Sequence, residues 1–295
     1  MNRMSLSVII PALNAGKYLP DLFEMLLKQS RRADEIIVVD SESEDDTVSI
    51  CKANEAVTLI SIKRKDFDHG KTRDMALRAS KGDIVVFLTQ DALPAGETFL
   101  EKLTAPFFED STIALSTGRQ LPKADATNME RLVREFNYPA QSRIRSKEDI
   151  PEMGIKTFFC SDVCCAYRRD IYLELGGFDH PLKTNEDMFF AAKAIHAGYR
   201  ISYTADAEVY HSHNLTLKEQ YRRNYNQGYE IEKKKEMLNV GSYQQEGMKL
   251  VRYVSGHLLK KGHILGFIHF FFDCCARKSG HSAGIKAYHR EQKQG

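Results

Sequence analysis

The sequence predicts an α/β fold: a mostly parallel sheet with helices covering both faces. Four continuous apolar runs, rich in Val, Ile and Leu, indicate strands that are buried on both sides. Amphipathic segments with the period of an α-helix alternate with these runs along the first hundred residues. Regular alternation of strands and helices is typical of a parallel sheet covered on both faces, so we expect that architecture here.

The predicted elements follow in order. Strands are expected at 5–13, 35–43, 57–63 and 83–92, with helices at 17–29, 45–56 and 72–82 between them. From about residue 95 the alternation loosens. We then expect helices at 97–108, 125–150, 170–179 and 185–199, and strands at 111–121 and 200–211. After residue 214 the pattern is helical and basic. The chain therefore divides into one large domain over 1–214 and a helical region over 215–295.

Composition narrows the functional classes. The chain has 295 residues, of which 42% are hydrophobic and 28% charged, as is usual for a globular enzyme. It shows no leader pattern, no apolar run of the roughly 18 residues that a membrane span requires, and no zinc-type spacing among its six cysteines. We therefore expect a cytoplasmic protein with reduced thiols.

The small net charge of +2 hides an uneven distribution. Residues 1–210 contain 27 Lys and Arg against 33 Asp and Glu, whereas residues 211–295 contain 15 against 7. A basic tail on an acidic body suggests an anionic partner, such as a phosphate group or a membrane surface. A solvated helical face is the alternative interpretation.

Acidic residues gather where the predicted strands end. Ligands of open α/β sheets bind outside the carboxyl ends of the strands. The residues expected there are Pro11, Ala12, Asn14, Asp40, Ser41, Asp66, Asp68, His69, Thr89, Gln90 and Asp91. Carboxylates do not cradle phosphate by themselves, but they bind ribose hydroxyls, a base edge, or a divalent cation that in turn binds phosphate.

Two common nucleotide motifs do not fit. A dinucleotide fingerprint should follow the first strand, but PALNAGKY contains only Gly16. The tripeptide GKT at 70–72 lies between a strand and a helix, as in a P-loop. That motif needs a glycine where this chain has Lys65, and the intervening DFDH is acidic. Both motifs are therefore rejected.

Five segments in order resemble inverting family 2 glycosyltransferases of the GT-A fold. They are SVIIPALNAGKYLPDLFEMLLKQS, EIIVVDSESEDDT, FDHGKTRDMALRASKGDIVVFLTQDALP, GGFD and NEDMFFAAKAIHAGY, and together they span about residues 1–215. FDHGKTR and VYHSHN further resemble bacterial rhamnosyltransferases, which build surface polysaccharides from dTDP-rhamnose. The resemblance implies a nucleotide-binding half over 1–95 and an acceptor half over 96–214.

For the donor site, the resemblance implies that the nucleobase packs on the end of the first strand and that Asp40 accepts a hydrogen bond from the base or ribose. The expected donor-binding residues are Pro11, Ala12, Asn14, Asp40, Asp68, Arg73, Gln90 and Asp91. A solvated turn remains the alternative for Asp68.

The resemblance also implies a metal ion, Mg²⁺ or Mn²⁺. Asp91 lies where the family has its D-x-D motif, although Thr89 replaces the first acid. A further ligand is expected from the YHSHN segment, with His211 favoured over His213. Such a metal neutralises negative charge that develops on the leaving diphosphate.

For catalysis, the resemblance implies Asp187 as the general base, with Glu186 as its neighbour, and Asp162 as a partner for an acceptor hydroxyl. An ordinary acid at a helix N-terminus is the alternative for Asp187, and a turn acid is the alternative for Asp162. A base is useful only within hydrogen-bond reach of the hydroxyl that it deprotonates.

We therefore expect transfer of a sugar, with rhamnose favoured, onto a growing surface glycan, which the resemblance implies is lipid-linked. A UDP-sugar donor, a nucleotidyltransferase of the same fold, and an inactive scaffold or nucleic-acid-binding module are the alternatives. Tyrosines interleaved with basic residues in 219–235 can bind nucleic acid, but the chain has no other RNA-binding signature, so we expect no nucleic-acid partner. Peripheral contact with the inner face of the membrane is our hypothesis for the basic tail; a dimerising or core-covering helix pair is its rival.

Overall fold

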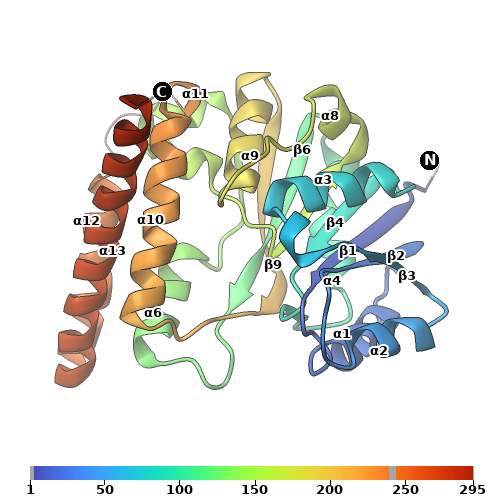
Figure 1. Ribbon diagram of the computed structural model, residues 1–295, viewed down its shortest axis with the longest axis horizontal. Helices are drawn as coiled ribbons and strands as arrows, with labels where there is room; N and C mark the ends of the chain where they lie inside the picture. The colour runs from blue at the N-terminus through green and yellow to red at the C-terminus, as the bar shows by residue number, and fades with distance from the viewer. Residues whose placement is uncertain (1–2, 239–243, 295) are drawn as a thin grey trace.

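A computed structural model describes residues 3–238 and 244–294. Its sheet has the strand order β3-β2-β1-β4-β8-β6-β9-β5, and β7 pairs with β9 (Figure 1). The strands are β1 (Leu6–Ala12), β2 (Glu35–Asp40), β3 (Val57–Ser61), β4 (Ile84–Leu88), β5 (Leu93–Pro94), β6 (Ile113–Leu121), β7 (Arg143–Arg145), β8 (Cys164–Arg168) and β9 (Arg200–Tyr210).

The first four predicted strands form the parallel half of the sheet. Strand β1 pairs in parallel with β2 and β4, and β2 pairs in parallel with β3. The register places Ala12 beside Asp40, so β1 and β2 end side by side. Loops that follow these strands therefore share one edge of the sheet, where the sequence places its acids.

The second half of the sheet is mixed, which differs from the prediction of a mostly parallel sheet. Strand β8 lies antiparallel between β4 and β6, and β5 and β7 are antiparallel to β9, whereas β6 and β9 are parallel. The predicted helix over 125–150 is also wrong beyond its first part. Helix α6 (Asn128–Asn137) ends just before Pro139, and β7 and a short 3-10 turn, η2 (Lys147–Asp149), follow. Proline disfavours helical backbone in the residue before it, so the helix stops there.

Helices cover the two faces of the sheet and bury opposite sides of the same strands. On one face lie α1 (Leu19–Leu27), α2 (Thr47–Ala53), α4 (Phe99–Thr104) and α5 (Pro106–Glu109); on the other lie α3 (His69–Ala79), α8 (Arg169–Glu174) and α9 (Glu186–His196). In β1, Val8 and Ile10 pack against the first set and Ile9 against the second. This alternation is why the central strands are apolar throughout. The short segments η1 (Arg64–Asp66), α7 (Ile150–Met153) and η3 (Gly154–Phe158) complete the order.

The C-terminal region is helical, as predicted, and consists of α10 (Leu217–Lys233), α11 (Lys235–Leu238), α12 (Gln244–Lys260) and α13 (Ile264–Gln292). Helices α10 and α13 lie side by side along one flank of the molecule (Figure 1). Glycines permit their close approach: a Cβ atom at Gly284 would lie 2.1 Å from the carbonyl oxygen of Tyr225, and one at Gly280 would lie 2.3 Å from that of Tyr221.

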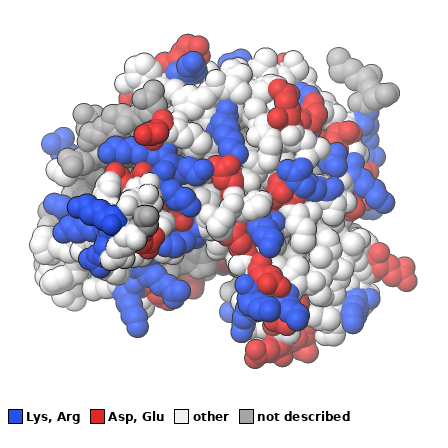
Figure 2. All heavy atoms as spheres, turned by 45° about the horizontal axis from the view of Figure 1, so that its top comes forward, with Lys and Arg blue, Asp and Glu red and all other residues white. Residues whose placement is uncertain are grey.

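Helix α12 joins this pair to the rest of the protein. Val254 and Leu258 of α12 share a small core with Leu132 and Val133 of α6 and Phe270 of α13. Lys and Arg side chains gather over the C-terminal helices, on the left in Figure 2. No helix in the described ranges is both long and apolar enough to cross a membrane. All six cysteines are free thiols; four are buried, whereas Cys274 is half-buried and Cys275 is exposed.

Candidate active site

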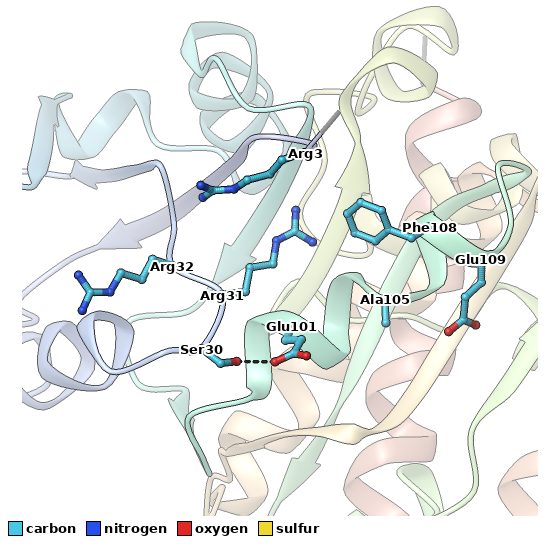
Figure 3. A pocket seen from close by; sticks show the side chains of 8 residues that line it. All are labelled: Arg3, Ser30, Arg31, Arg32, Glu101, Ala105, Phe108 and Glu109. Carbon is cyan, nitrogen blue, oxygen red and sulfur yellow. Dashed lines mark hydrogen bonds between the residues drawn. The ribbon is translucent and has the colours of Figure 1, made fainter. Parts of the chain in front are cut away.

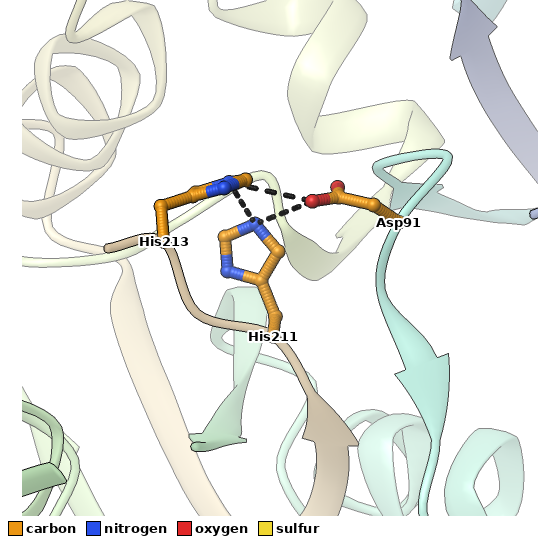
Figure 4. A group of neighbouring side chains, drawn as sticks. All are labelled: Asp91, His211 and His213. Atoms are coloured by element: carbon orange, nitrogen blue, oxygen red, sulfur yellow. Dashed lines mark hydrogen bonds and ion pairs between the residues drawn. The ribbon is translucent and has the colours of Figure 1, made fainter. Parts of the chain in front are cut away.

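Asp91, His211 and His213 form a compact group at one edge of the sheet (Figure 4). Asp91 follows β4, both histidines follow β9, and the pairing of Leu93 with Tyr210 brings the two segments together. The Oδ2 atom of Asp91 lies 3.5 Å from Nε2 of His211 and 3.3 Å from Nε2 of His213. The two Nε2 atoms are 3.1 Å apart. Three ligand atoms therefore converge on one point.

Gln120, at the end of β6, orients His211. Its Oε1 atom lies 3.0 Å from Nδ1 of His211 and also accepts a hydrogen bond from the guanidinium of Arg134. An amide oxygen only accepts, so Nδ1 carries the proton and Nε2 presents its lone pair to Asp91. Burial lowers the pKa of His211 to about 3, against the opposing effect of Asp91. The imidazole is therefore neutral at physiological pH, as a metal ligand must be.

Lys123 shares the same carboxylate oxygen. Its Nζ atom lies 3.5 Å from Oδ2 of Asp91 and 5.5 Å from the ring centroid of Tyr18. Burial opposes ionisation of Asp91, but His211, Lys123 and His213 together hold its pKa below the ordinary value. Asp91 is therefore an anion. A divalent cation at this carboxylate would replace the ammonium of Lys123 as its counter-charge.

This group fits a divalent transition metal. One carboxylate oxygen and two imidazole nitrogens suit Mn²⁺, whereas Mg²⁺ favours oxygen ligands. The hydrogen bond from His211 to Gln120 is the outer contact that fixes a metal-binding imidazole. The structure thus brings Asp91 and His211 together, and His213 offers a third ligand where Thr89 replaces the first acid of the motif.

A second group, largely buried, surrounds the guanidinium of Arg73 on α3. Its Nη1 atom lies 3.1 Å from Oε1 of Glu186, and its Nε atom lies 3.4 Å from Oδ2 of Asp162. The backbone N–H of Asp162 donates to Oδ2 of Asp187 at 3.1 Å, and the hydroxyl of Tyr167 donates to Oδ1 of Asp162 at 2.7 Å. Two carboxyl groups thus contact one guanidinium, and the third, that of Asp187, lies next to them.

Burial and the excess of carboxyl groups shift the pKa values of Asp162 and Asp187. Burial raises the pKa of Asp162 well above its ordinary value, against the opposing effect of Arg73. Burial and then the neighbouring Glu186 raise the pKa of Asp187 to about 7. Asp162 and Glu186 are buried, whereas Asp187, at the start of α9, is only partly buried. Asp187 is therefore the member of the group that can exchange a proton with a bound molecule near neutral pH.

Two consecutive residues join the two groups. The side chain of Gln120 donates to Oγ of Ser161 at 3.0 Å, and the next residue, Asp162, donates its backbone N–H to Asp187. The loop before β8 thus links Gln120, which orients His211, to the carboxylate of Asp187.

The predicted residues at the ends of β1 and β2 lie together at one edge of the sheet. Pro11 is half-buried and Ala12 is buried. Asn14 has a φ of 51°, and its side chain accepts the backbone N–H of Glu44, which holds the two loops together. Asp40 is buried, and its Oδ1 atom has no hydrogen-bond partner among the described residues. Contact of this carboxylate with the donor therefore remains a prediction.

Asp68 and Gln90 have structural partners. Asp68 caps α3 by accepting the backbone N–H of Lys71 at 2.8 Å, and it also accepts that of Leu182 at 3.1 Å. The amide of Gln90 makes two hydrogen bonds with the backbone of Leu13, one through each end. These side chains position the loops around the site, and their contact with a donor remains a prediction.

Two large cavities differ in their relation to this site. One, of about 640 Å³, lies against Asp91 and is also lined by Lys17, Tyr18 and Lys123. The other, of about 720 Å³, is lined by Arg3, Ser30, Arg31, Arg32, Glu101, Ala105, Phe108 and Glu109 (Figure 3). It lies near the amino ends of β1 and β2, away from the site. Arg31 there donates to Thr104 and to the carbonyl of Met4, so its role is structural.

Solved structures show which class this fold defines. The mannosyltransferase PcManGT from Pyrobaculum calidifontis, in complex with GDP-Man and Mn²⁺, matches with a TM-score of 0.64 over 97% of this chain and 87% of that chain, at 18% identity. Residues 1–349 of TarS from Staphylococcus aureus match with a TM-score of 0.58 over 98% of this chain and 92% of that chain, at 19% identity. In the longer TarS structure, this chain spans 44% of that chain. The fold is the GT-A fold, as predicted.

Sequence comparisons identify the family. The family model described as Glycosyl transferase family 2 matches residues 7–176. The O-antigen chain rhamnosyltransferase RfbN of Salmonella typhimurium is 41% identical over 226 residues, which cover 76% of this chain and 72% of that protein. WbaN of Salmonella anatum, with the same description, is 41% identical over 76% of this chain and 71% of its own length. The chain belongs to glycosyl transferase family 2 and is a glycosyltransferase.

Proposed function

We propose that this glycosyltransferase moves L-rhamnose from dTDP-rhamnose, with inversion, onto a lipid-linked glycan of the cell surface. The observation that carries the proposal is the link between the Asp91–His211–His213 group and Asp187 through Ser161 and Asp162. Direct displacement at a sugar carbon requires a group that stabilises the leaving diphosphate and a nearby proton acceptor. The choice of rhamnose is supported by the names of the two Salmonella relatives.

In the proposed reaction, Asp187 accepts the proton of an acceptor hydroxyl as that oxygen bonds to the anomeric carbon of rhamnose. The bond from this carbon to the diphosphate breaks, and dTDP leaves. Arg73 and Asp162 hold Asp187 in place through the contacts described above. A divalent cation bound by Asp91, His211 and His213, which we propose to be Mn²⁺, would supply positive charge beside the diphosphate.

We further propose that the protein acts at the inner face of the membrane, and the structure offers a surface for that contact. The α12–α13 tip, residues 259–272, exposes six large apolar side chains between 47% and 83%: Leu259, Ile264, Leu265, Ile268, Phe271 and Phe272. Residues 247–272 contain four Lys or Arg and no Asp or Glu. Exposed aromatic and aliphatic side chains among cations are typical of helices that lie on anionic lipid.

A donor comparison tests the proposed activity. The purified chain would be incubated with dTDP-rhamnose, UDP-GlcNAc or GDP-mannose, Mn²⁺ and a lipid-linked glycan extract, and release of the nucleoside diphosphate would be followed. We expect turnover with dTDP-rhamnose above that with the other donors. Faster turnover of UDP-GlcNAc would keep the transferase but reject rhamnose. Absence of turnover and of nucleotide binding with every donor would favour an inactive scaffold.

A further inference from the structure

A smaller polar cavity lies between the catalytic domain and the C-terminal helices. It has a volume of about 180 Å³ and lies among α6, α10 and α13. Tyr138 and His213 line it from the catalytic domain, Arg223 lines it from α10, and Arg277 lines it from α13. None of these residues has a role in the donor site proposed above, except that His213 belongs to the metal-binding group. The cavity therefore adjoins the metal-binding group through His213.

Three guanidinium groups line this cavity, and two of them are neutralised. Arg134 pairs with Glu130 at 2.7 Å, and Arg277 pairs with Asp273 at 2.6 Å. Arg223 has no hydrogen-bond or ion-pair partner in the part of the chain that the structure describes, and it is accessible to solvent. The cavity thus carries an uncompensated positive charge, and a guanidinium is well shaped to bind phosphate oxygens in a bidentate manner.

The cavity lies close to both the α12–α13 tip and the metal-binding group. Arg277 follows Phe272 of the α12–α13 tip by five residues on the same helix, which corresponds to roughly 7.5 Å along its axis. His213, which also lines the cavity, points toward Asp91. The cavity therefore lies between the surface that we propose contacts lipid and the site that we propose transfers the sugar.

We propose that this cavity binds the phosphate or diphosphate group that joins the acceptor glycan to its lipid, with Arg223 as the principal ligand. The inference rests on the proposed function, because it requires a lipid-linked acceptor. A group held here would have its lipid directed toward the tip and its glycan directed toward Asp187. The donor carries a diphosphate too, so the experiment must separate the two sources.

Calorimetric titration with farnesyl diphosphate tests the cavity directly, because this probe has a lipid and a diphosphate but no sugar and no nucleotide. The titrations use the full chain with EDTA, so that metal at Asp91 does not contribute. We expect the wild type to bind farnesyl diphosphate and Arg223→Gln to bind it about tenfold or more weakly, since one charge-assisted contact is lost. Arg222→Gln, a change at the neighbouring exposed arginine outside the cavity, should match the wild type.

Two further titrations separate lipid and donor contributions. Farnesol lacks the diphosphate, and its binding should be equal in the wild type and Arg223→Gln. Binding of dTDP with Mn²⁺ should also be equal in both proteins. Equal affinity of wild type and Arg223→Gln for farnesyl diphosphate would overturn the proposal. A parallel loss of dTDP binding would also overturn it, because Arg223 would then serve the donor.

The same measurements distinguish failure of this inference from failure of the proposed function. If the wild type binds farnesyl diphosphate through Arg223 but does not bind any nucleotide, the cavity stands and the donor assignment fails. Thermal unfolding of both variants shows whether a lost affinity reflects a lost fold, and Arg223→Lys, which keeps the charge, should recover part of the affinity.

Discussion

The side-chain oxygen of Gln120 lies 3.0 Å from Nδ1 of His211, and the same oxygen accepts a hydrogen bond from Arg134. Through its amide nitrogen, Gln120 also reaches Ser161, next to the residue that contacts Asp187. One neutral side chain thus fixes the tautomer of His211 and connects it to the loop that contacts Asp187.

Replacing Gln120 tests this connection. Gln120→Leu removes the acceptor that orients His211, so Mn²⁺ affinity should fall about 10- to 100-fold, as for other outer contacts of metal ligands. Electron paramagnetic resonance of free Mn²⁺ during titration measures that affinity. Gln120→Glu keeps an acceptor oxygen and should retain most of it. Unchanged affinity in the leucine variant would show that His211 does not need this orientation.

The pH dependence of turnover tests Asp187. Its pKa is raised to about 7, and a general base works only when deprotonated, so turnover should fall as the pH drops through about 7 and level off above it. Asp187→Asn should lower kcat by about 10²- to 10⁴-fold while dTDP still binds. A flat profile between about pH 5 and about pH 8, or loss of dTDP binding in the variant, would remove Asp187 from this role.

Arg73 should stabilise the fold by compensating the buried carboxyl groups. Arg73→Leu leaves Asp162 and Glu186 without their counter-charge, which typically costs about 3–5 kcal/mol of unfolding free energy. Burial already raises the pKa of Asp162, and without the opposing guanidinium that pKa in the folded state rises further. Protons then bind more tightly to the folded than to the unfolded chain, so the loss should be largest at high pH.

Urea unfolding of this variant at about pH 5 and about pH 8 measures the difference. Arg73→Lys keeps the positive charge but lacks the planar guanidinium, so it should recover part of the stability. An equal loss at both values of pH would mean that packing rather than charge explains the effect.

The packing of α10 on α13 predicts a contrast between two glycines. Gly284→Val would place atoms against the backbone of Tyr225 and should lower the unfolding free energy by about 1–3 kcal/mol or more. Gly256, on α12, has open space at its Cβ position. Gly256→Ala should therefore raise stability by up to about 1 kcal/mol through helix propensity. Thermal unfolding measures both, and equal effects would contradict the close approach of the two backbones.

The α12–α13 tip should determine binding to anionic vesicles. Leu265 and Phe271 are 83% and 58% exposed, and charges there would oppose insertion into the lipid interface. The double variant Leu265→Glu, Phe271→Glu should lower vesicle partitioning about tenfold or more. Phe108→Glu is the matched control, because Phe108 is 48% exposed far from the tip. Unchanged flotation with vesicles, accompanied by a change from dimer to monomer, would assign the surface to a second copy of the chain.

The sequence predicted the elements that depend on local pattern. The four parallel strands and their helices were predicted because each is a continuous apolar run or a helical stripe, and Asp91 was predicted at the site because it lies just after such a run. Strand β8 was missed because its antiparallel pairing with β4 and β6 depends on partners that are distant in the sequence.

Gln120 was not predicted at the site for a similar reason, because its position depends on tertiary structure. Gln120 follows a register shift between β6 and β9 after Gly118, where a Cβ atom would lie 2.6 Å from the carbonyl oxygen of Ala207. Nothing local to the sequence indicates that irregularity, or that Gln120 would meet His211. Asp68, in contrast, was predicted at the site from its place in the sequence. In the structure its carboxylate accepts backbone N–H groups from Lys71 and Leu182, and only the fold brings Leu182 close to it.

Calorimetric titration of dTDP into the purified chain, with Mn²⁺ and again after chelation, tests the central claim most directly. The Asp91–His211–His213 group predicts tight binding with Mn²⁺, and affinity lower by about tenfold or more without the metal or in His211→Ala. Equal binding of dTDP in all of these conditions would contradict a metal-assisted donor site at these residues.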